Sequence, residues 1–445
     1  MQSVSTIGRR FFSCLILSGM VAITAFSQDN SPWSRYGLGD MVPSVNVVSR
    51  GMGHTSAAYS DMQTINFVNP ASYSKFGMQR SILDIGIDIN NRTISNNRGA
   101  SYSSANAYIP YLAGGFQLKG EKSKTNWGLV FGLRPLTKVS YNLESAQKIP
   151  AGDSILYNFE GNGGTYQAFM GTAVGIKNFS IGVNAGYRFG SKDYTTRAIL
   201  LNDTAPSRYT AGQKVIRNNF GGAFLEAGVQ YQLNLSKKSA LHFGAYGSLQ
   251  APLNATRDER YETYFLSGEA GISTQIDSIS ETKNIKGTIQ YPSYYGFGIM
   301  FDRVDKGRLN VALDYVLHNW AEYRYYGDVD FVQNSWQVKA GAQYLPDISG
   351  AGKSYWSNVF YRAGFLFTRE PYTIDGTMNS YGITLGAGLP IRKFSYAEIN
   401  RSNMVNAAFE FGQRSNRNSL LRENYFRLAV SFSMSDIWFI KRKYD

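Results

Sequence analysis

The sequence predicts an all-β fold, a transmembrane antiparallel β-barrel of about fourteen strands with an N-terminal hatch or plug in its lumen. Three observations predict it. Apolar residues alternate with small or polar ones from residue 80 almost to the C-terminus. Beyond residue 27 no run of 18 apolar residues occurs, so we expect no transmembrane helix. Aromatic residues make up 14% of the chain and glycines number 45, a composition that favours strands.

Residues 1–27 have the pattern of a secretory signal peptide. Arg9 and Arg10 form a positive start, an apolar run follows, and small residues precede the expected cleavage point. We therefore expect export to the outer membrane of a Gram-negative bacterium. Cys14, the only cysteine, lies inside this leader, so the mature chain is expected to be stable without disulfides.

Residues 28–79 form the expected hatch or plug segment, which is rich in glycine and serine and has no period. Its clearest feature is an Asn-Pro-Ala sequence. Proline lacks a backbone donor and asparagine bonds locally to backbone, so the tripeptide is interpreted as a fixed turn, with a gate element as the alternative. The candidate hatch and gate residues are Gly51, Gly53, Asp61, Asn69, Pro70 and Ala71.

The barrel itself is expected over residues 80–434, followed by a periplasmic tail at 435–445. In the first strand Leu83, Ile85 and Ile87 share one face, while Asp84 and Asp88 share the other. Links after even strands tend to be short and those after odd strands longer, as periplasmic turns and extracellular loops are. The fourteen expected strands lie near 80–92, 105–118, 126–142, 163–177, 179–198, 218–235, 240–262, 284–301, 307–324, 333–345, 358–370, 379–391, 403–414 and 424–434.

A soluble β-sandwich is the competing architecture, but its polar face would meet water and be rich in lysine and glutamate. Here the expected inner face is small, as in Gly382, Thr384 and Gly386. It also carries nearly balanced charges, which favours an ion-pair network bracing a plugged lumen because lumenal charges are costly unless paired. The expected network consists of Asp84, Asp88, Glu226, Asp314 and Glu410 with Arg134, Arg188, Lys339, Arg362 and Arg427.

The hatch segment resembles the FadL/TodX family of outer-membrane transporters. Its two glycines, Ala57, Asp61 and the Asn-Pro-Ala sequence come in the family's order, and residues 308–320, 336–346 and 361–372 look like late strands of the family. The resemblance implies passive transport of fatty-acid-like or hydrocarbon-like molecules through the barrel wall. It also implies an alternative, a non-transporting accessory subunit of an outer-membrane machine for type IX secretion or barrel assembly. In the family an interrupted third strand opens a lateral exit, which makes Pro135 the lateral-gate candidate; the end of a strand is the other interpretation.

The net charge of +13 favours anionic partners, but the basic residues are scattered. Expected partners are outer-membrane lipid and lipopolysaccharide, a hydrophobic small-molecule ligand, and other outer-membrane proteins, with no nucleic acid. His54, His242 and His318 are far apart and match no catalytic or metal-binding spacing. We therefore expect no enzyme activity, no metal and no cofactor.

Overall fold

A computed structural model describes residues 31–76, 80–96, 98–118, 125–148, 154–201, 210–267, 272–349, 354–373, 376–391, 403–416 and 421–437. The expected signal peptide and residues 438–445 of the expected tail lie outside this part of the chain. Within it, none of the helices is long and apolar enough to span a bilayer.

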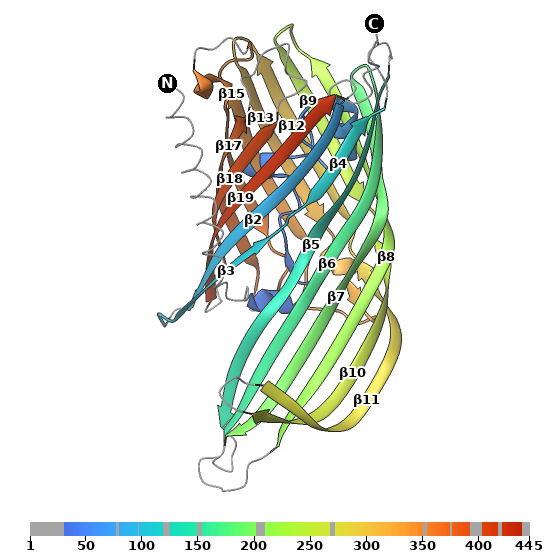
Figure 1. The fold of residues 1–445 in the computed structure, drawn as a ribbon, viewed down its shortest axis with the longest axis vertical. Coiled ribbons are helices and arrows are strands. Elements are labelled where there is room, and N and C mark those ends of the chain that lie inside the picture. The colour runs from blue at the N-terminus through green and yellow to red at the C-terminus, as the bar shows by residue number, and fades with distance from the viewer. Residues whose placement is uncertain are drawn as a thin grey trace, which may run out of the picture.

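Fourteen antiparallel strands close into a barrel, as the alternation predicted (Figure 1). The first strand, β2 (Arg80–Asn96), pairs with the last, β19 (Leu421–Ile437), and this pair closes the cylinder. Three barrel strands are each interrupted and consist of two elements: β3 (Ser101–Tyr108) with β4 (Leu112–Gln117), β9 (Ser239–Ser248) with β10 (Ala251–Ser267), and β11 (Ile272–Tyr291) with β12 (Tyr294–Val304). The other strands are β5 (Thr125–Lys148), β6 (Ser154–Ile176), β7 (Phe179–Leu201), β8 (Ala211–Asn234), β13 (Arg308–His318), β15 (Ser335–Leu345), β16 (Phe360–Arg369), β17 (Met378–Pro390) and β18 (Met404–Asn416). A two-residue strand, β14 (Arg324–Tyr325), and two short 3-10 helices, η4 (Trp320–Glu322) and η5 (Tyr355–Asn358), lie in the links.

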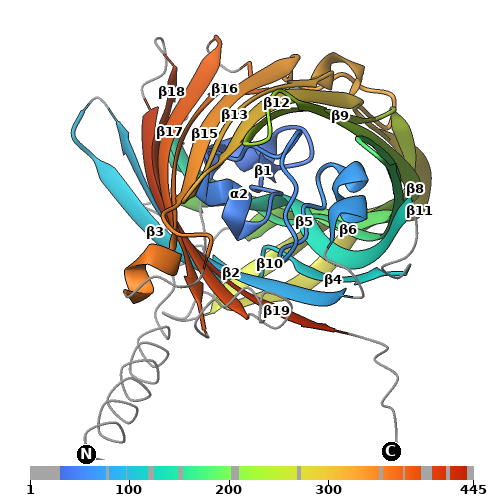
Figure 2. The same cartoon turned by 90° about the horizontal axis from the view of Figure 1, so that it is seen from above.

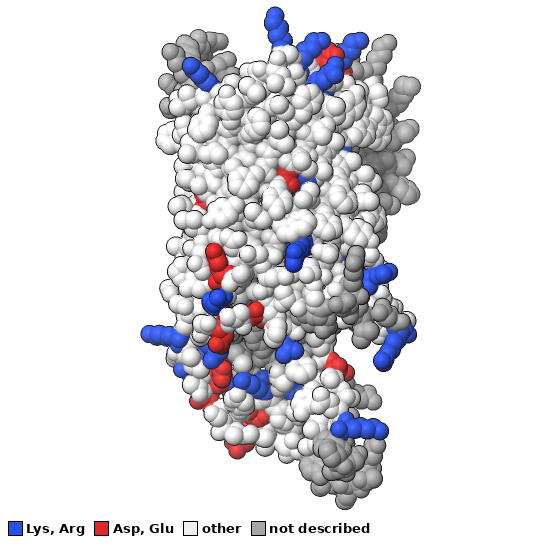
Figure 3. Space-filling model, turned by 180° about the vertical axis from the view of Figure 1, so that it is seen from behind, with Lys and Arg blue, Asp and Glu red and all other residues white. Residues whose placement is uncertain are grey.

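Side chains alternate between the two faces of the wall in the predicted register. In β2, Leu83 and Ile87 are 45% and 52% exposed, whereas Asp84 and Asp88 are fully buried. Figure 3 shows a broad band nearly free of charged side chains, with charges gathered at one rim and toward the opposite end. The apolar band is the lipid-facing surface expected of a membrane barrel.

One side of the wall is much taller than the other. Strands β5 and β8 contain 24 residues each and β6 and β7 contain 23, whereas β13 has 11 and β16 has 10. A tilted strand needs only about 9–11 residues to cross a bilayer, so the long strands project beyond it. The short turn at Lys177 and Asn178 lies at the end of the barrel opposite to the projecting strands (Figure 1). Because short turns of such barrels face the periplasm, we expect the projecting ends of the long strands to face outside the cell.

Residues 31–76, which we call the plug segment, lie inside the barrel (Figure 2). The segment contains a 3-10 helix η2 (Pro32–Arg35), the short strand β1 (Asp40–Met41), one turn of α-helix α2 (Val47–Gly51) and a second 3-10 helix η3 (Pro70–Lys75). Apolar plug side chains, Phe67 and Tyr73 among them, form one buried cluster with Val130, Phe169 and Phe224 of the wall. The plug and the wall therefore share a core.

Candidate functional site

A row of inward-facing glycines holds the backbone of the plug against the wall. A Cβ atom added at Gly244 would lie 1.9 Å from the carbonyl oxygen of Ala57, and one at Gly182 would lie 2.5 Å from the carbonyl carbon of Pro70. Such distances are too short for any side chain, so the backbones touch directly. We call this set the glycine girdle: Gly128, Gly182, Gly228, Gly244, Gly298, Gly341, Gly364 and Gly386.

Strand register places the girdle residues side by side. Gly182 pairs with Gly228, Gly244 pairs with Gly298, and Gly341 pairs with Gly364. Together these pairs form a flat surface on the inner wall. The plug backbone lies directly against Gly182, Gly244, Gly341 and Gly364, whereas Gly228 faces the Asn69 side chain and Gly298 faces the Ala57 methyl group and the Asp314 carboxylate. The small inner face inferred from the sequence is thus the seat of the plug.

The Asn-Pro-Ala sequence both forms a turn and anchors the plug. Asn69 is the N-cap of η3, and its side-chain oxygen accepts a hydrogen bond from the backbone of Ala71 at 3.1 Å, with Pro70 as the first helical residue. The Asn69 amide nitrogen donates to the carbonyl oxygen of Ala57 at 2.7 Å and to that of Val229 on β8 at 3.2 Å. The fixed turn of the sequence interpretation is therefore also tied to the barrel wall.

The other candidate hatch residues are distributed along the same segment. Gly53 has φ of +62° and packs directly on the backbone of Phe365, and Gly51 lies against Gly386 of the girdle. Asp61 accepts hydrogen bonds from the Tyr59 hydroxyl at 2.8 Å and the Gln63 backbone at 2.7 Å, so it closes a local turn.

Three buried ion-pair clusters join the plug to the wall or brace the wall above it. In the first, Glu410 contacts His54 at 3.1 Å, Arg427 at 2.9 Å and Arg50 at 3.4 Å, and Arg50 also pairs with Asp88. Arg50 and His54 belong to the plug, and the other three residues belong to strands. This cluster therefore fixes the plug electrostatically.

The second cluster centres on Glu226 of β8. Its carboxylate pairs with Arg188 at 3.1 Å and Arg134 at 3.4 Å, and it accepts hydrogen bonds from Tyr294 at 2.6 Å and Gln167 at 3.0 Å. Every one of these partners is a wall residue. The cluster links five strands of the wall, β5 to β8 and β12, as the balanced inner-face charges predicted.

The third cluster was not predicted. Asp40 of the plug pairs with Arg414 at 2.7 Å and with Arg92 at 3.0 Å, and Glu423 binds both arginines. The three wall residues keep the inward register of their strands, so the alternation could have identified them. Asp40 and Arg50 lie in the plug, where no periodicity marks which side chains face the wall.

Four residues of the expected network have no oppositely charged group within 4.0 Å among the described residues. Asp84 accepts a hydrogen bond from the Tyr111 hydroxyl at 3.2 Å. Asp314 accepts the backbone N–H groups of Ser56 and Ala57 at 2.6 and 2.8 Å, which is another contact between plug and wall. The other two are Arg362, which donates to side-chain amides, and Lys339.

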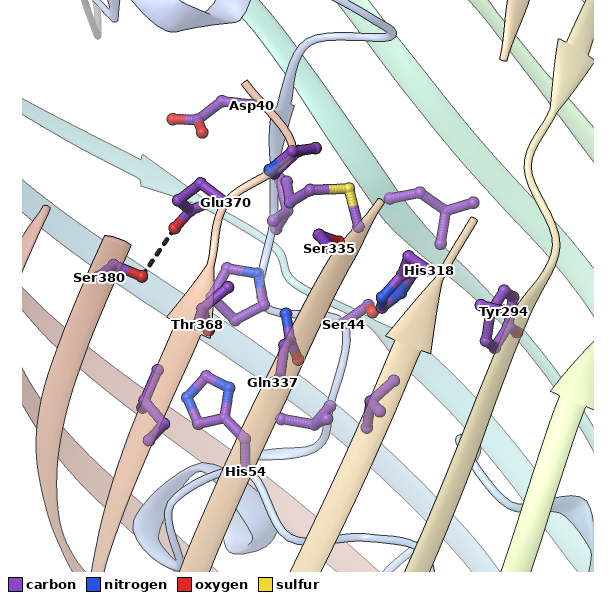
Figure 4. A pocket seen from close by; sticks show the side chains of 18 of the residues that line it. Asp40, Ser44, His54, Tyr294, His318, Ser335, Gln337, Thr368, Glu370 and Ser380 are labelled. Atoms are coloured by element: carbon purple, nitrogen blue, oxygen red, sulfur yellow. Dashed lines mark hydrogen bonds between the residues drawn. The ribbon is translucent and has the colours of Figure 1, made fainter. Parts of the chain in front are cut away.

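A cavity of about 150 Å³ lies between the plug and the wall, and its lining comes from strands on both sides of the barrel, including β5, β8, β15 and β18 (Figure 4). Its lining is mainly polar and charged. His54 of the plug, Gln337 of β15 and Thr368 of β16 face it, as does Glu370, which accepts a hydrogen bond from Ser380 at 2.7 Å. A larger apolar hollow, about 620 Å³, lies on the outward face of the wall around Phe243 and Leu313, where lipid is expected. Among the described residues no three potential ligands are grouped to hold a metal ion.

Pro135 lies within β5 at a β-bulge. The ladder to β6 continues across it, from Arg134 to Thr137, with Leu136 as the extra residue. On the other side of β5 the partner strand β4 ends opposite Leu133. Beyond that point β3 pairs with β2, and the free edge of β5 is paired by β1 of the plug segment. Pro135 therefore lies beside a stretch of β5 that is not paired with the preceding wall strand. We call this stretch the lateral seam, and the plug segment covers it.

These features define a plugged fourteen-stranded outer-membrane β-barrel of the FadL/TodX type. The chain belongs to the BamG family, whose family model matches residues 8–445. No curated protein matches it.

Solved structures with the same fold include a FadL homologue of Pseudomonas aeruginosa, with 12% sequence identity, a TM-score of 0.55, and coverage of 91% of this chain and 100% of that one. The toluene transporter TodX of Pseudomonas putida has 15% identity and a TM-score of 0.54, covering 90% of this chain and 98% of that one. The CymD monoaromatic hydrocarbon channel has 14% identity and a TM-score of 0.52, covering 88% and 97%. At these identities the likeness concerns the fold.

Proposed function

We propose that this protein is a permanently plugged barrel that serves as an accessory subunit of an outer-membrane machine. The observation that carries the proposal is the glycine girdle, on which the plug backbone lies in direct contact with the wall. A plug that moves to open a passage would have to leave these contacts on several strands at once. Tight backbone packing of this kind is suited to a fixed element.

The charges at the plug support the same function. Displacing the plug would separate Arg50 and His54 from Asp88 and Glu410, all of which are buried. Breaking a buried pair is strongly unfavourable, on the order of 3–5 kcal/mol, because it leaves a charge without compensation. Opening would therefore cost several kcal/mol.

The lumen also offers a poor route for an apolar solute. The cavity above the plug is lined by charged groups such as Arg134, Glu226 and Arg427, whereas sites for apolar ligands are predominantly lined by apolar and aromatic side chains. Of the two machines that the family resemblance implies, the match to the BamG family model favours barrel assembly over type IX secretion.

Native mass spectrometry after gentle detergent extraction tests this proposal. We expect the tagged full-length protein to leave the membrane in a stoichiometric assembly with other outer-membrane proteins and without a retained apolar ligand. Extraction in a harsher detergent provides the lone barrel as the mass reference. A lone barrel that carries a lipid-like or hydrocarbon-like molecule under the gentle conditions would contradict the accessory role.

Passive transport of hydrophobic molecules is the second candidate function, and the seam beside Pro135 favours it. The edge of β5 is covered there by β1 of the plug segment and by backbone hydrogen bonds such as that from Ser31 to Ser140 at 2.9 Å. A lateral exit at this seam would agree with the fold likeness to channels that are described as carrying toluene and other monoaromatic hydrocarbons. The cavity at the seam is small, about 20 Å³, so this function requires the plug segment to move.

A further inference from the structure

Lys339 of β15 differs from the other cations that line the lumenal cavity. Arg134 and Arg188 pair with Glu226, Arg427 pairs with Glu410, and Arg414 pairs with Asp40. Lys339 is 7% exposed, and within the described residues no carboxylate lies within 4.0 Å of its ammonium group and no protein atom accepts a hydrogen bond from it.

Two carboxylates, one on β13 and one just after β16, are the nearest in register to Lys339. Asp314 is its register partner on β13; the Oδ2 atom of Asp314 binds the backbone of Ser56 and Ala57, and its Oδ1 atom has no hydrogen-bond partner among the described residues and lies more than 4.0 Å from the ammonium group. On β16 the register partner of Lys339 is Leu366, and Glu370 lies four residues further along the chain. At the rise of a strand, four residues span about 13 Å. The ammonium group therefore has an empty side that faces the cavity.

Three further polar side chains on this part of the wall have no hydrogen-bond partner among the described residues. Ser335 and Gln337 precede Lys339 on the same inward face of β15, and Thr368 lies opposite Gln337 on β16 (Figure 4). Buried polar groups normally have partners, and a buried ammonium without one is costly. A cavity of about 150 Å³ has room for several waters or for one small ion with fewer waters.

We propose that this cavity binds a small oxyanion, a carboxylate or an inorganic phosphate, at Lys339. The ammonium group supplies the charge, and the Ser335 and Thr368 hydroxyls and the Gln337 amide supply neutral hydrogen-bond donors. The polar and charged lining distinguishes the site from a hydrocarbon pathway. It is also independent of whether the barrel acts alone or in an assembly.

Thermal unfolding of the detergent-solubilised full-length protein tests the site, with sodium acetate, sodium phosphate and sodium chloride compared at equal ionic strength. We expect acetate or phosphate, but not chloride, to raise Tm in a saturable manner by about 2 °C, because a ligand that binds only the folded state stabilises it. Lys339→Met should abolish the increase, and Lys238→Met, in an exposed turn, should retain it. Thr368→Val should raise the apparent Kd at least threefold.

Two results would overturn the proposal. One is the absence of a saturable increase in wild-type protein, and the other is an equal increase in wild-type protein and Lys339→Met. If Lys339→Met fails to fold, Thr368→Val and Gln337→Leu decide the matter. An unchanged apparent Kd in both would show that the ion does not bind in this cavity.

Discussion

Replacing Gly244 with valine is expected to destabilise the folded barrel by about 3 kcal/mol, the upper range for overpacking. The new Cβ would lie 1.9 Å from the carbonyl oxygen and 2.3 Å from the carbonyl carbon of Ala57, and neither backbone can move without disturbing its neighbours. The urea midpoint of the detergent-solubilised protein should fall. The compact, fast-migrating band that folded barrels give on unheated SDS gels should weaken in parallel.

Gly212→Val is the matched control, since a Cβ at this strand position meets nothing within 4 Å. It adds the same side chain to a strand and should leave the urea midpoint near that of the wild type. Equal midpoints for Gly244→Val and wild-type protein would show that the plug does not lie on the wall at this position.

Glu226→Gln should cost a similar amount, on the order of 3 kcal/mol, because it leaves two buried guanidinium groups without their counter-charge. Arg134 and Arg188 both pair with this carboxylate, which is 2% exposed. The substitution keeps the shape of the side chain, so a lower urea midpoint would report the lost charge rather than a cavity.

Asp305→Asn is the control for charge removal at the surface. A hydrogen bond from Lys238 and the charge of its ammonium group lower the pKa of Asp305, which favours the ionised carboxylate. Both partners are exposed to solvent, and exposed pairs contribute little to stability. We expect no measurable change in the urea midpoint. A decrease in the urea midpoint as large as that of Glu226→Gln would show that burial of the Glu226 ion pairs does not explain their contribution to stability.

The alternation of residue types predicted the barrel because the bilayer imposes the same pattern on every strand. Leu83 and Asp84 are adjacent, and the requirement for lipid outside and a filled lumen inside assigns each to its face. The same reasoning placed Glu226, Arg134 and Arg188 on inward faces, and the structure brings them together.

Contacts of the plug could not be predicted in this way. The plug segment has no period, so nothing local shows that Arg50 reaches Glu410, a residue 360 positions away. Gly244 and Gly298 were recognisable as small lumenal residues, but only the fold shows that Ala57 lies on them. Pro135 suggested an interruption of its strand, whereas the structure has a bulge at Leu136 and the interruption in the preceding strand, between β3 and β4.

In an accessory barrel the plug stays in place while the protein functions. A disulfide between plug and wall tests it, through Gly51→Cys combined with Arg362→Cys. A Cβ at Gly51 would lie 3.4 Å from the Cβ of Arg362, close to the 3.5–4.5 Å range of disulfides. Cys14 is the only native cysteine and belongs to the expected leader, so unwanted pairing is not expected. The reduced form of the same variant serves as the control for the two substitutions.

The oxidised and reduced forms are compared for the proteins that co-purify with the barrel and for the rate at which cells take up a hydrophobic fluorescent probe. A fixed plug predicts that locking it changes neither result. If oxidation slows uptake and a reductant restores it, the plug moves and the protein is a transporter.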